Sequence, residues 1–203
     1  MAFRLGLIGL CTSHPGRWVP IIRELARDIE IDLVAVWDSA EVRPAGYAQE
    51  FCRQHDIPRA LDSLDEMIEL VDGVIVHTAN WDRHISQARP FVAAKKSVLI
   101  DKPMVGNLND AKQLRQWAQC GARITGGSSV RVAPEISQLL NIPRSQRGEL
   151  HTVFASCGTD RFFYGIHGYA MLSGVLGPGV QAVQSVGQGK SSLVKLDWGD
   201  GHG

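Results

Sequence analysis

Lys102 stands in a tripeptide, Asp101-Lys102-Pro103, that directly follows an aliphatic run. Because the residue before a proline is held extended, we expect the lysine to project from the carboxyl edge of a sheet, where open parallel sheets bind ligands. A partly buried lysine beside a carboxylate can donate a hydrogen bond to a substrate oxygen or exchange a proton with it. The alternative is that Asp101 and Lys102 form a solvated turn.

His167 is a second residue suited to acid-base chemistry. It ends the sequence Tyr164-Gly-Ile-His167, at the first turn of an expected helix. The helix dipole favours the neutral imidazole there, which is the form that accepts a proton. The alternative is a histidine with a surface or packing role.

The segment after the first aliphatic run suits the phosphates of a dinucleotide. In the GxGxxG pattern of a dinucleotide-binding fold, backbone amides and a helix N-terminus hold the pyrophosphate. Only the first glycine, Gly9, is present, because Cys11 and His14 occupy the other two positions. Side chains of Thr12, Ser13 or His14 can donate hydrogen bonds instead, so this whole segment is a candidate cofactor site. The alternative is that Gly9 forms a tight turn and Ser13 caps the next helix.

Asp38 ends the second aliphatic run, where an acidic residue can accept both hydroxyls of an adenosine ribose and repel a 2′-phosphate. This position favours NAD over NADP. Arg43 lies nearby and keeps NADP possible. The alternative is that Asp38 is a solvated turn residue or caps a helix starting near Glu41.

A further group of polar residues follows the third aliphatic run. His77, Asn80 and His84 cluster at that strand end and at the start of its helix, which suits contacts to a ligand in the crevice. We expect Thr78, Asn80 and His84 to contact the cofactor, together with Asp101 at the next strand end. The alternative is that these groups only cap the helix.

The elements that must position these residues follow an alternating pattern. Short aliphatic runs alternate with amphipathic segments over residues 3–102, which is typical of parallel strands joined by helices. The predicted strands are Phe3–Gly9, Ile31–Trp37, Gly73–Thr78, Ser97–Asp101 and Arg123–Gly127. Apolar residues at helical spacing lie between them, at Trp18, Ile21, Ile22, Leu25 and Ile29, at Ile85, Ala88 and Val92, and at Ala111, Leu114 and Trp117. This pattern predicts a doubly wound Rossmann domain over residues 1–127.

The remaining residues, 128–203, predict an abbreviated α+β domain with an open, mainly antiparallel sheet. Helices are expected over Ala133–Leu140 and Gly165–Leu176, and a connecting loop over Ile142–Gly148. Strands are expected over Leu150–Ser156, Val180–Gly187 and Ser191–Trp198, with the last two joined by Gln188–Lys190 as a hairpin. An open sheet edge invites pairing with another chain, so we expect at least a dimer through this sheet.

Composition narrows the classes of partner. The chain has 203 residues, is 44% hydrophobic and 21% charged, and its 21 basic side chains balance 21 acidic ones. A zero balance argues against nucleic acid or an anionic membrane surface as a partner and favours a small substrate. The apolar run at the N-terminus is interrupted by Arg4 and Gly6, so we interpret it as a buried strand and not as a signal peptide. No segment has the length of a membrane span.

Four cysteines lie far apart, at Cys11, Cys52, Cys120 and Cys157, with no CxxC pair. This spacing indicates neither a disulfide framework nor a zinc site, so we predict no metal ligands and a reducing, cytoplasmic location.

Four segments in this order resemble the glucose-fructose oxidoreductase and inositol dehydrogenase family, along nearly the whole chain. Ile75–His84 resembles the family's strand, turn and helix with its Asn and His, and Ser97–Met104 resembles its strand ending in Glu-Lys-Pro, with Asp for Glu. Gly127–Glu135 is similar to the segment entering the second domain, and Tyr164–His167 to the family's histidine motif.

The resemblance implies an NAD(P)-dependent oxidoreductase with a Rossmann domain and an open-sheet substrate domain. Hydride would pass between a nicotinamide and a carbon of a sugar, inositol or related polyol. Lys102 would bind the reacting oxygen and His167 would move its proton, so the two should face each other across a cleft between the domains. The alternative is a non-catalytic nucleotide-binding or structural protein that keeps the fold.

Three departures from the family pattern weaken the transfer of the family's roles to this chain, and the first and the third favour that alternative. The glycine fingerprint is degraded, Phe163 occupies a position that is often acidic in these dehydrogenases, and the predicted substrate-domain sheet is short.

Overall fold

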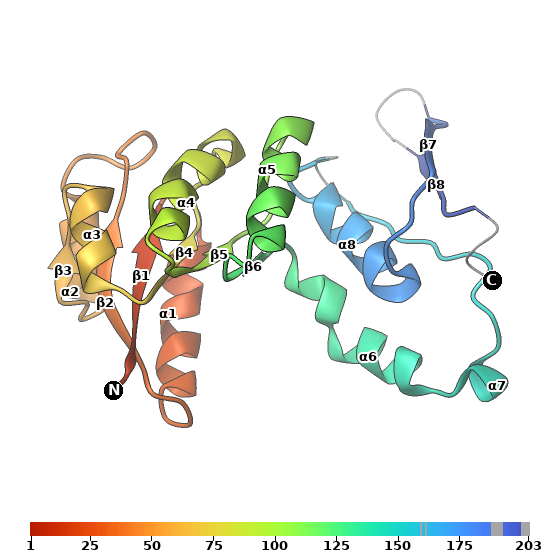
Figure 1. Ribbon diagram of the computed structural model, residues 1–203, viewed down its shortest axis with the longest axis horizontal. Helices are drawn as coiled ribbons and strands as arrows, with labels where there is room; N and C mark the ends of the chain where they lie inside the picture. The colour runs from red at the N-terminus through yellow and green to blue at the C-terminus, as the bar shows by residue number, and fades with distance from the viewer. Residues whose placement is uncertain (159, 161, 188–192, 200–203) are drawn as a thin grey trace. The chain divides into compact units, whose positions relative to one another are not determined.

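The computed structural model describes residues 1–158, 160, 162–187 and 193–199. The chain divides into two compact units, Met1–Gly127 and Ser128–Gly203. Figure 1 shows the sheet and its helices in the first unit, and the helices α6, α7 and α8 with the strands β7 and β8 in the second. Each unit is described by itself below.

The first unit is built on one parallel sheet of six strands. The strands are β1 (Phe3–Ile8), β2 (Ile31–Trp37), β3 (Arg59–Ala60), β4 (Gly73–Val76), β5 (Ser97–Ile100) and β6 (Ile124–Gly126). Their order across the sheet is β3-β2-β1-β4-β5-β6, and every neighbouring pair is parallel. This is the doubly wound Rossmann order, so the predicted fold class is confirmed. Strand β3 was not predicted, because two residues carry no periodic pattern.

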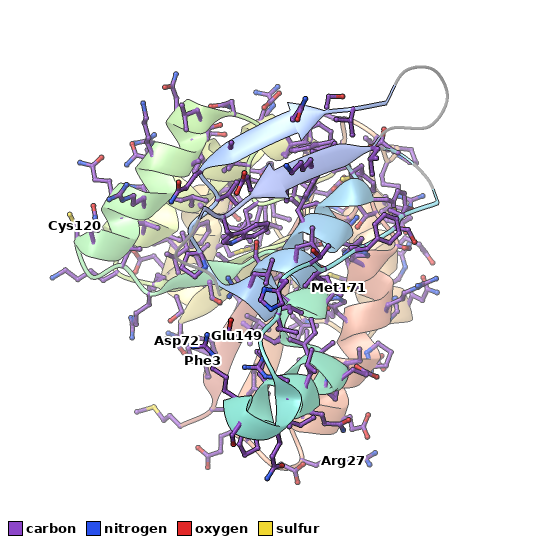
Figure 2. The ribbon with its side chains drawn as sticks, turned by 90° about the vertical axis from the view of Figure 1, so that its right-hand side faces the viewer. Phe3, Arg27, Asp72, Cys120, Glu149 and Met171 are labelled. Carbon is purple, nitrogen blue, oxygen red and sulfur yellow. The ribbon has the colours of Figure 1, made fainter. Side chains whose placement is uncertain are left out.

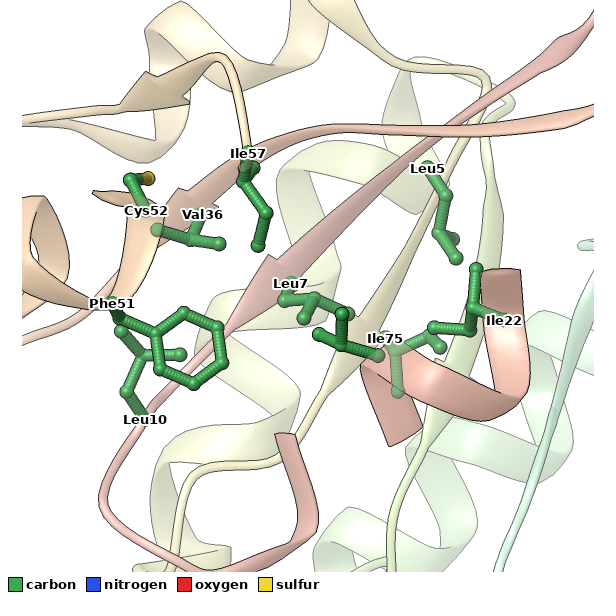
Figure 3. Close-up of a cluster of buried hydrophobic side chains, with 10 residues drawn as sticks. Leu5, Leu7, Leu10, Ile22, Val36, Phe51, Cys52, Ile57 and Ile75 are labelled. Carbon is green, nitrogen blue, oxygen red and sulfur yellow. The ribbon is translucent and has the colours of Figure 1, made fainter. Parts of the chain in front are cut away.

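Helices cover both faces of this sheet. They are α1 (His14–Leu25), α2 (Tyr47–Gln54), α3 (Leu64–Leu70), the short 3-10 helix η1 (Trp81–Arg83), α4 (His84–Ala93) and α5 (Leu108–Gln119). The core on one face joins α1 and α2 to the strands through residues such as Ile22, Phe51 and Leu7 (Figure 3). The core on the other face includes Met67 of α3 and Phe91 of α4. Burial on both faces explains the nearly continuous aliphatic strands.

Two sequence-based predictions within this unit were wrong. Ile21, Leu25 and Ile29 are about half exposed, because Val19 and Ile22 supply the buried face of α1 and the helix ends at Leu25. The helix expected near Glu41 begins only at Tyr47.

The second unit contains η2 (Ser129–Val132), α6 (Pro134–Asn141), α7 (Arg144–Arg147), α8 (Gly165–Leu176), β7 (Ala182–Ser185) and β8 (Val194–Asp197). Strands β7 and β8 pair antiparallel, which confirms the predicted hairpin and the mainly antiparallel sheet. The turn expected at Gln188–Lys190 lies outside the described residues. The helices predicted at Ala133–Leu140 and Gly165–Leu176 are confirmed as α6 and α8.

Two other predictions for the second unit were wrong. Residues Leu150–Ser156 form no strand in the described part of the chain, because β7 and β8 pair with each other and Phe154 is exposed. An extended segment without a neighbouring strand lacks the ladder that defines a strand. Within the loop expected at Ile142–Gly148, residues Arg144–Arg147 form the single turn α7, which ends at Gly148 with φ +80°.

The second unit buries few large side chains. Among its described residues, the buried hydrophobic ones are Ile136 and Trp198, and the indole of Trp198 donates to the Gly177 carbonyl at 3.1 Å. The described part of the chain holds no helix with the length and apolar character of a membrane span.

Candidate functional site

The predicted cofactor residues gather where the carboxyl ends of β1 and β4 meet. Gly9 follows β1 with φ +84°, a conformation that L side chains rarely adopt. A Cβ on Gly9 would lie 2.4 Å from Thr78 Oγ1 and 2.7 Å from the Thr78 backbone. Only a glycine allows these two strand ends to approach so closely. In the sheet, the chain order reverses between β1 and β4, which is the switch point where such folds bind ligands.

The loop after Gly9 is held by its own side chains. The Cys11 Sγ accepts a hydrogen bond from the Ala79 amide at 2.9 Å, and burial raises the pKa of this thiol although that amide opposes the shift. Thr12 Oγ1 accepts from the His14 amide at 3.2 Å. Ser13 precedes α1 but its side chain makes no capping hydrogen bond, so the alternative that it only caps the helix is wrong. Its hydroxyl is available to a ligand at this helix N-terminus.

Asp38 is a partly buried turn residue after β2 and not a helix cap. Its Oδ1 accepts from the Leu10 amide at 2.6 Å and its Oδ2 from the Ala40 amide at 3.1 Å. Arg43 lies beside the same loop, where its Nε donates to the Leu10 carbonyl at 3.2 Å and its guanidinium stacks 4.7 Å above the centre of the Tyr47 ring. These bonds fix the carboxylate, and each oxygen retains further acceptor capacity.

Thr78 and His84 hold the end of β4 in place. Thr78 Oγ1 donates to Gln87 Oε1 at 2.8 Å, within the core. The ring of His84 lies between two carbonyls, with Nε2 2.7 Å from the Thr78 oxygen and Nδ1 3.0 Å from the Met104 oxygen. Since both ring nitrogens face carbonyl oxygens, the structure gives His84 a positioning role and not the ligand contact that we expected.

Asn80 takes the alternative role of a cap. Its side-chain oxygen accepts a hydrogen bond from the Asp82 amide at 3.1 Å and so begins η1. The Nδ2 group of the same side chain can still donate a hydrogen bond to a ligand.

Asp101 is the centre of a buried network at the end of β5. Its Oδ1 accepts from the Lys102 amide at 2.7 Å, and its Oδ2 contacts Nδ1 of His14 and, at 3.3 Å, Nδ1 of His77. Burial by itself would raise the pKa of Asp101, but the hydrogen bonds from the two histidines and from Lys102 together hold it below its usual value. The carboxylate is therefore ionised at neutral pH.

His77 completes this network; its place at a strand end suggested a ligand contact, but it was not among the residues expected to bind the cofactor. It is 1% exposed, and the Trp18 ring packs edge-on against it at 4.9 Å between ring centres. Burial lowers the pKa of His77, and its bond to Asp101 offsets only part of that effect. A signal was present in the sequence, since His77 directly follows a buried strand.

Lys102 is 6% exposed, so it does not form the solvated turn that was the alternative. Burial lowers the pKa of its ammonium group, and the charge of Asp101 opposes this effect. A lysine with a lowered pKa at the ligand-binding edge of a sheet is suited to exchange a proton with a bound substrate.

His167 belongs to the second unit, at the start of α8. Its Nδ1 lies 2.7 Å from Ser128 Oγ, and the Tyr164 ring lies 6.4 Å away between ring centres. The bond to Ser128 orients the imidazole, as a second group does for catalytic histidines.

A dinucleotide fits the residues of the first unit. The close approach at Gly9 leaves no space for a side chain beneath the loop, Ser13 stands uncapped at the start of α1, and Asp38 presents a fixed carboxylate at the end of β2. In this fold, a glycine at the first position allows the tight turn, the helix N-terminus binds the pyrophosphate, and an acidic residue at the end of the second strand binds the adenosine ribose.

Comparison with known proteins agrees with this geometry. Residues 3–124 match the family model described as an oxidoreductase family with an NAD-binding Rossmann fold. A trans-1,2-dihydrobenzene-1,2-diol dehydrogenase of Sus scrofa is 28% identical over 163 residues, which cover 78% of this chain and 46% of that protein. The corresponding enzyme of Danio rerio is 39% identical over 74 residues, or 36% of this chain and 22% of that protein. The chain thus spans less than half the length of these curated relatives.

Solved structures show the same fold at low identity. GenD2 from gentamicin A biosynthesis, in complex with NAD, superposes with a TM-score of 0.74 at 21% identity, covering 98% of this chain and 63% of that one. The UDP-N-acetylglucosamine 3-dehydrogenase GnnA of Acidithiobacillus ferrooxidans gives a TM-score of 0.71 at 22% identity, covering 100% and 68%. Together with the family match and the sheet order, these findings show that the chain belongs to the glucose-fructose oxidoreductase and inositol dehydrogenase family of oxidoreductases, with an NAD-binding Rossmann fold.

Proposed function

We propose that the protein is an NAD(P)-dependent dehydrogenase that transfers hydride between a nicotinamide and a hydroxyl-bearing carbon of a sugar, inositol or related polyol. The observation that carries this proposal is the buried Lys102, which has a lowered pKa and follows β5 at the same sheet edge as the Gly9 loop.

The cofactor would be held by the Gly9 loop and the residues around it. Ser13 and Thr12 would contact the phosphates at the start of α1, and Asp38 the adenosine ribose. Asn80 and Asp101 are proposed to line the same crevice. When bound, the nicotinamide supplies the hydride acceptor or donor. We propose NAD as the preferred form, because the fixed Asp38 carboxylate would repel a 2′-phosphate.

Lys102 and His167 would handle the substrate oxygen. Lys102 would donate a hydrogen bond to that oxygen and stabilise the alkoxide character that develops on it as its carbon loses hydride. His167, oriented by Ser128, would take the hydroxyl proton and return it in the reverse direction. Phe163 offers no carboxylate to assist, so we assign the orienting role to Ser128.

A polyol-like substrate is supported by the names of the relatives. A dihydrodiol dehydrogenase and a UDP-N-acetylglucosamine 3-dehydrogenase both act, by name, on carbons that bear a hydroxyl group. The chemistry assigned to Lys102 and His167 requires the same group and nothing else of the substrate. We further propose a cytoplasmic location, in keeping with the unpaired thiols of Cys11, Cys52 and Cys120.

A non-catalytic dinucleotide-binding protein is the second candidate. Cys11 and His14 at two glycine positions favour it, because they hinder close approach of the backbone to phosphates. The two candidates share cofactor binding and differ in turnover.

Calorimetric titration with NADH and NADPH tests the shared part. We expect NADH to bind more tightly, and Asp38→Asn to narrow the difference. Equal affinities, or a preference for NADPH, would remove the assigned role of Asp38 and shift attention to Arg43.

Oxidation of a panel of polyols with NAD⁺ separates the two candidates. Lys102→Met and His167→Ala should each lower the rate by roughly 100-fold while NADH affinity stays nearly unchanged, since acid-base catalysis contributes about that much. The exposed Lys112→Met on α5 is the matched control and should keep full activity. NADH binding without turnover of any polyol would favour the non-catalytic protein.

A further inference from the structure

Two imidazoles and one carboxylate converge at the carboxyl edge of the sheet. His14 begins α1, while His77 and Asp101 directly follow β4 and β5. One ligand-type atom of each residue lies within 4.8 Å of those of the other two. We call these three residues the His–Asp cluster. His14 and Asp101 are also among the expected cofactor contacts, whereas His77 has no assigned part in the proposed hydride transfer.

Both histidines direct a ring nitrogen to the same carboxylate oxygen. Nδ1 of His14 contacts Asp101 Oδ2, and Nδ1 of His77 lies 3.3 Å from that atom. The other oxygen, Oδ1, accepts the Lys102 amide at 2.7 Å, which fixes the plane of the carboxylate. The 3.3 Å separation between His77 and Asp101 suits two ligands that each lie about 2.0 Å from one tetrahedral metal ion.

The cluster has a closed base and an open side. His77 and Asp101 are 1% and 6% exposed, whereas 30% of the His14 side chain is accessible. An ion can therefore enter beside His14 and keep a water molecule as its fourth ligand, as in other sites with three protein ligands.

The ligand types restrict the ion. Imidazole nitrogens suit zinc, nickel, cobalt, copper and iron, whereas magnesium and calcium prefer oxygen ligands. Two imidazoles with one carboxylate and an open position form a known ligand set for zinc and for ferrous iron. We propose that His14, His77 and Asp101 bind one divalent transition-metal ion, for which Zn²⁺ is the test ion.

Calorimetric titration of the chelator-treated full chain with Zn²⁺ tests this proposal, with no dinucleotide present. The exposed cysteines are first replaced, as Cys120→Ser and Cys157→Ser, because surface thiols also bind zinc (Cys120 is labelled in Figure 2). We expect one ion per chain with micromolar or tighter affinity, and a thermal midpoint that rises with Zn²⁺ concentration.

His14→Ala is the decisive variant, because the partly accessible first residue of a helix can be replaced without loss of the fold. It should weaken Zn²⁺ binding by roughly 100-fold or more, since only two ligands remain. His77→Gln should do the same, and Co²⁺ absorption should report the loss of nitrogen ligands in both. The exposed His151→Ala is the control and should bind as the parent does. Absence of binding to the parent chain, or affinity that survives His14→Ala, would overturn the proposal.

Discussion

At the scale of single residues, the site depends on one close approach between two strand ends. Gly9 combines a positive φ with a neighbour, Thr78, at a distance that excludes a Cβ. Gly46, before α2, has nearly the same φ, +86°, but nothing lies within 4 Å of its Cβ position. Substitution of each glycine by alanine therefore separates the cost of the left-handed backbone conformation from the cost of the steric contact with Thr78.

Gly46→Ala should therefore lower the free energy of unfolding by about 1–2 kcal/mol, which is the cost of a left-handed conformation for an L residue. Gly9→Ala should cost at least about 2 kcal/mol more, because Thr78 must also move. Urea denaturation of both variants measures the difference. Equal losses would mean that the contact with Thr78 yields without cost.

Asp101 links the stability of the first unit to pH. Its pKa in the folded chain lies below the unfolded value of about 3.9. The ionised carboxylate therefore stabilises the fold at every pH above that unfolded value, and this contribution is lost as the pH falls through the folded pKa.

Asp101→Asn should thus lower the free energy of unfolding by about 1–3 kcal/mol at pH 7, because a buried hydrogen-bond network loses its central acceptor. The difference between variant and parent should shrink below pH 4, as the parent's own carboxylate takes up a proton. Denaturant titrations across this range measure it, with the exposed Asp28→Asn as control. A difference that stays constant down to pH 2 would contradict the ionised network.

The sequence identified most residues of the site but not what they touch. Asp38, Thr78, Asp101 and Lys102 all lie at strand ends of the sheet edge, because their positions follow from the aliphatic runs before them. The contact of His14 with Asp101 joins residues 87 positions apart. Side-chain contacts of that kind depend on the register between α1 and β5, which no local pattern encodes.

At the scale of elements, the N-termini of α3 and α1 differ in whether a serine caps the helix. Helix α3 begins with an N-cap, in which Ser63 Oγ accepts from the Glu66 amide at 3.3 Å and donates to the Glu66 carboxylate at 2.9 Å. Helix α1 begins with Ser13, which forms no such bond. Because Ser13 does not cap α1, hydrogen-bond donors at the start of this helix remain available to an anion.

Ser63→Ala should consequently lower the free energy of unfolding by about 1 kcal/mol, as loss of an N-cap usually does. Ser13→Ala should leave it within about 0.5 kcal/mol of the parent and should instead weaken NADH binding by roughly 3- to 10-fold, the value of one hydrogen bond. Thermal denaturation and calorimetry distinguish the two effects. A large stability loss in Ser13→Ala would mean that its hydroxyl serves the helix after all.

Strands that are buried on both faces could be predicted from the sequence, whereas a strand that forms only beside a neighbouring strand could not. Strands β1, β4 and β5 are covered on both faces, so their aliphatic runs identify them without ambiguity. Leu150–Ser156 also contains strand-forming apolar residues, yet no strand among the described residues pairs with it. Strand formation there depends on a partner that the local sequence cannot specify.

At the scale of the whole molecule, the two units differ in how much they bury. The first unit has two cores, one on each face of its sheet. In the second, the described hairpin is a sheet of two strands, and all four residues of β7 are exposed. An isolated two-stranded hairpin has marginal stability in water, so this sheet needs a further cover.

We predict that a second copy of the chain supplies that cover, so that the protein is a dimer paired through β7 and β8. Val183, which is 66% exposed on β7, should lie within the interface. Val183→Lys places a charge there and should convert the dimer to a monomer at micromolar concentration, as measured by light scattering. Val42→Lys is the matched control, since Val42 is 65% exposed but belongs to the first unit, and this variant should remain a dimer. A parent chain that is already monomeric under these conditions would show that the hairpin is covered by its own unit or tolerates its exposure.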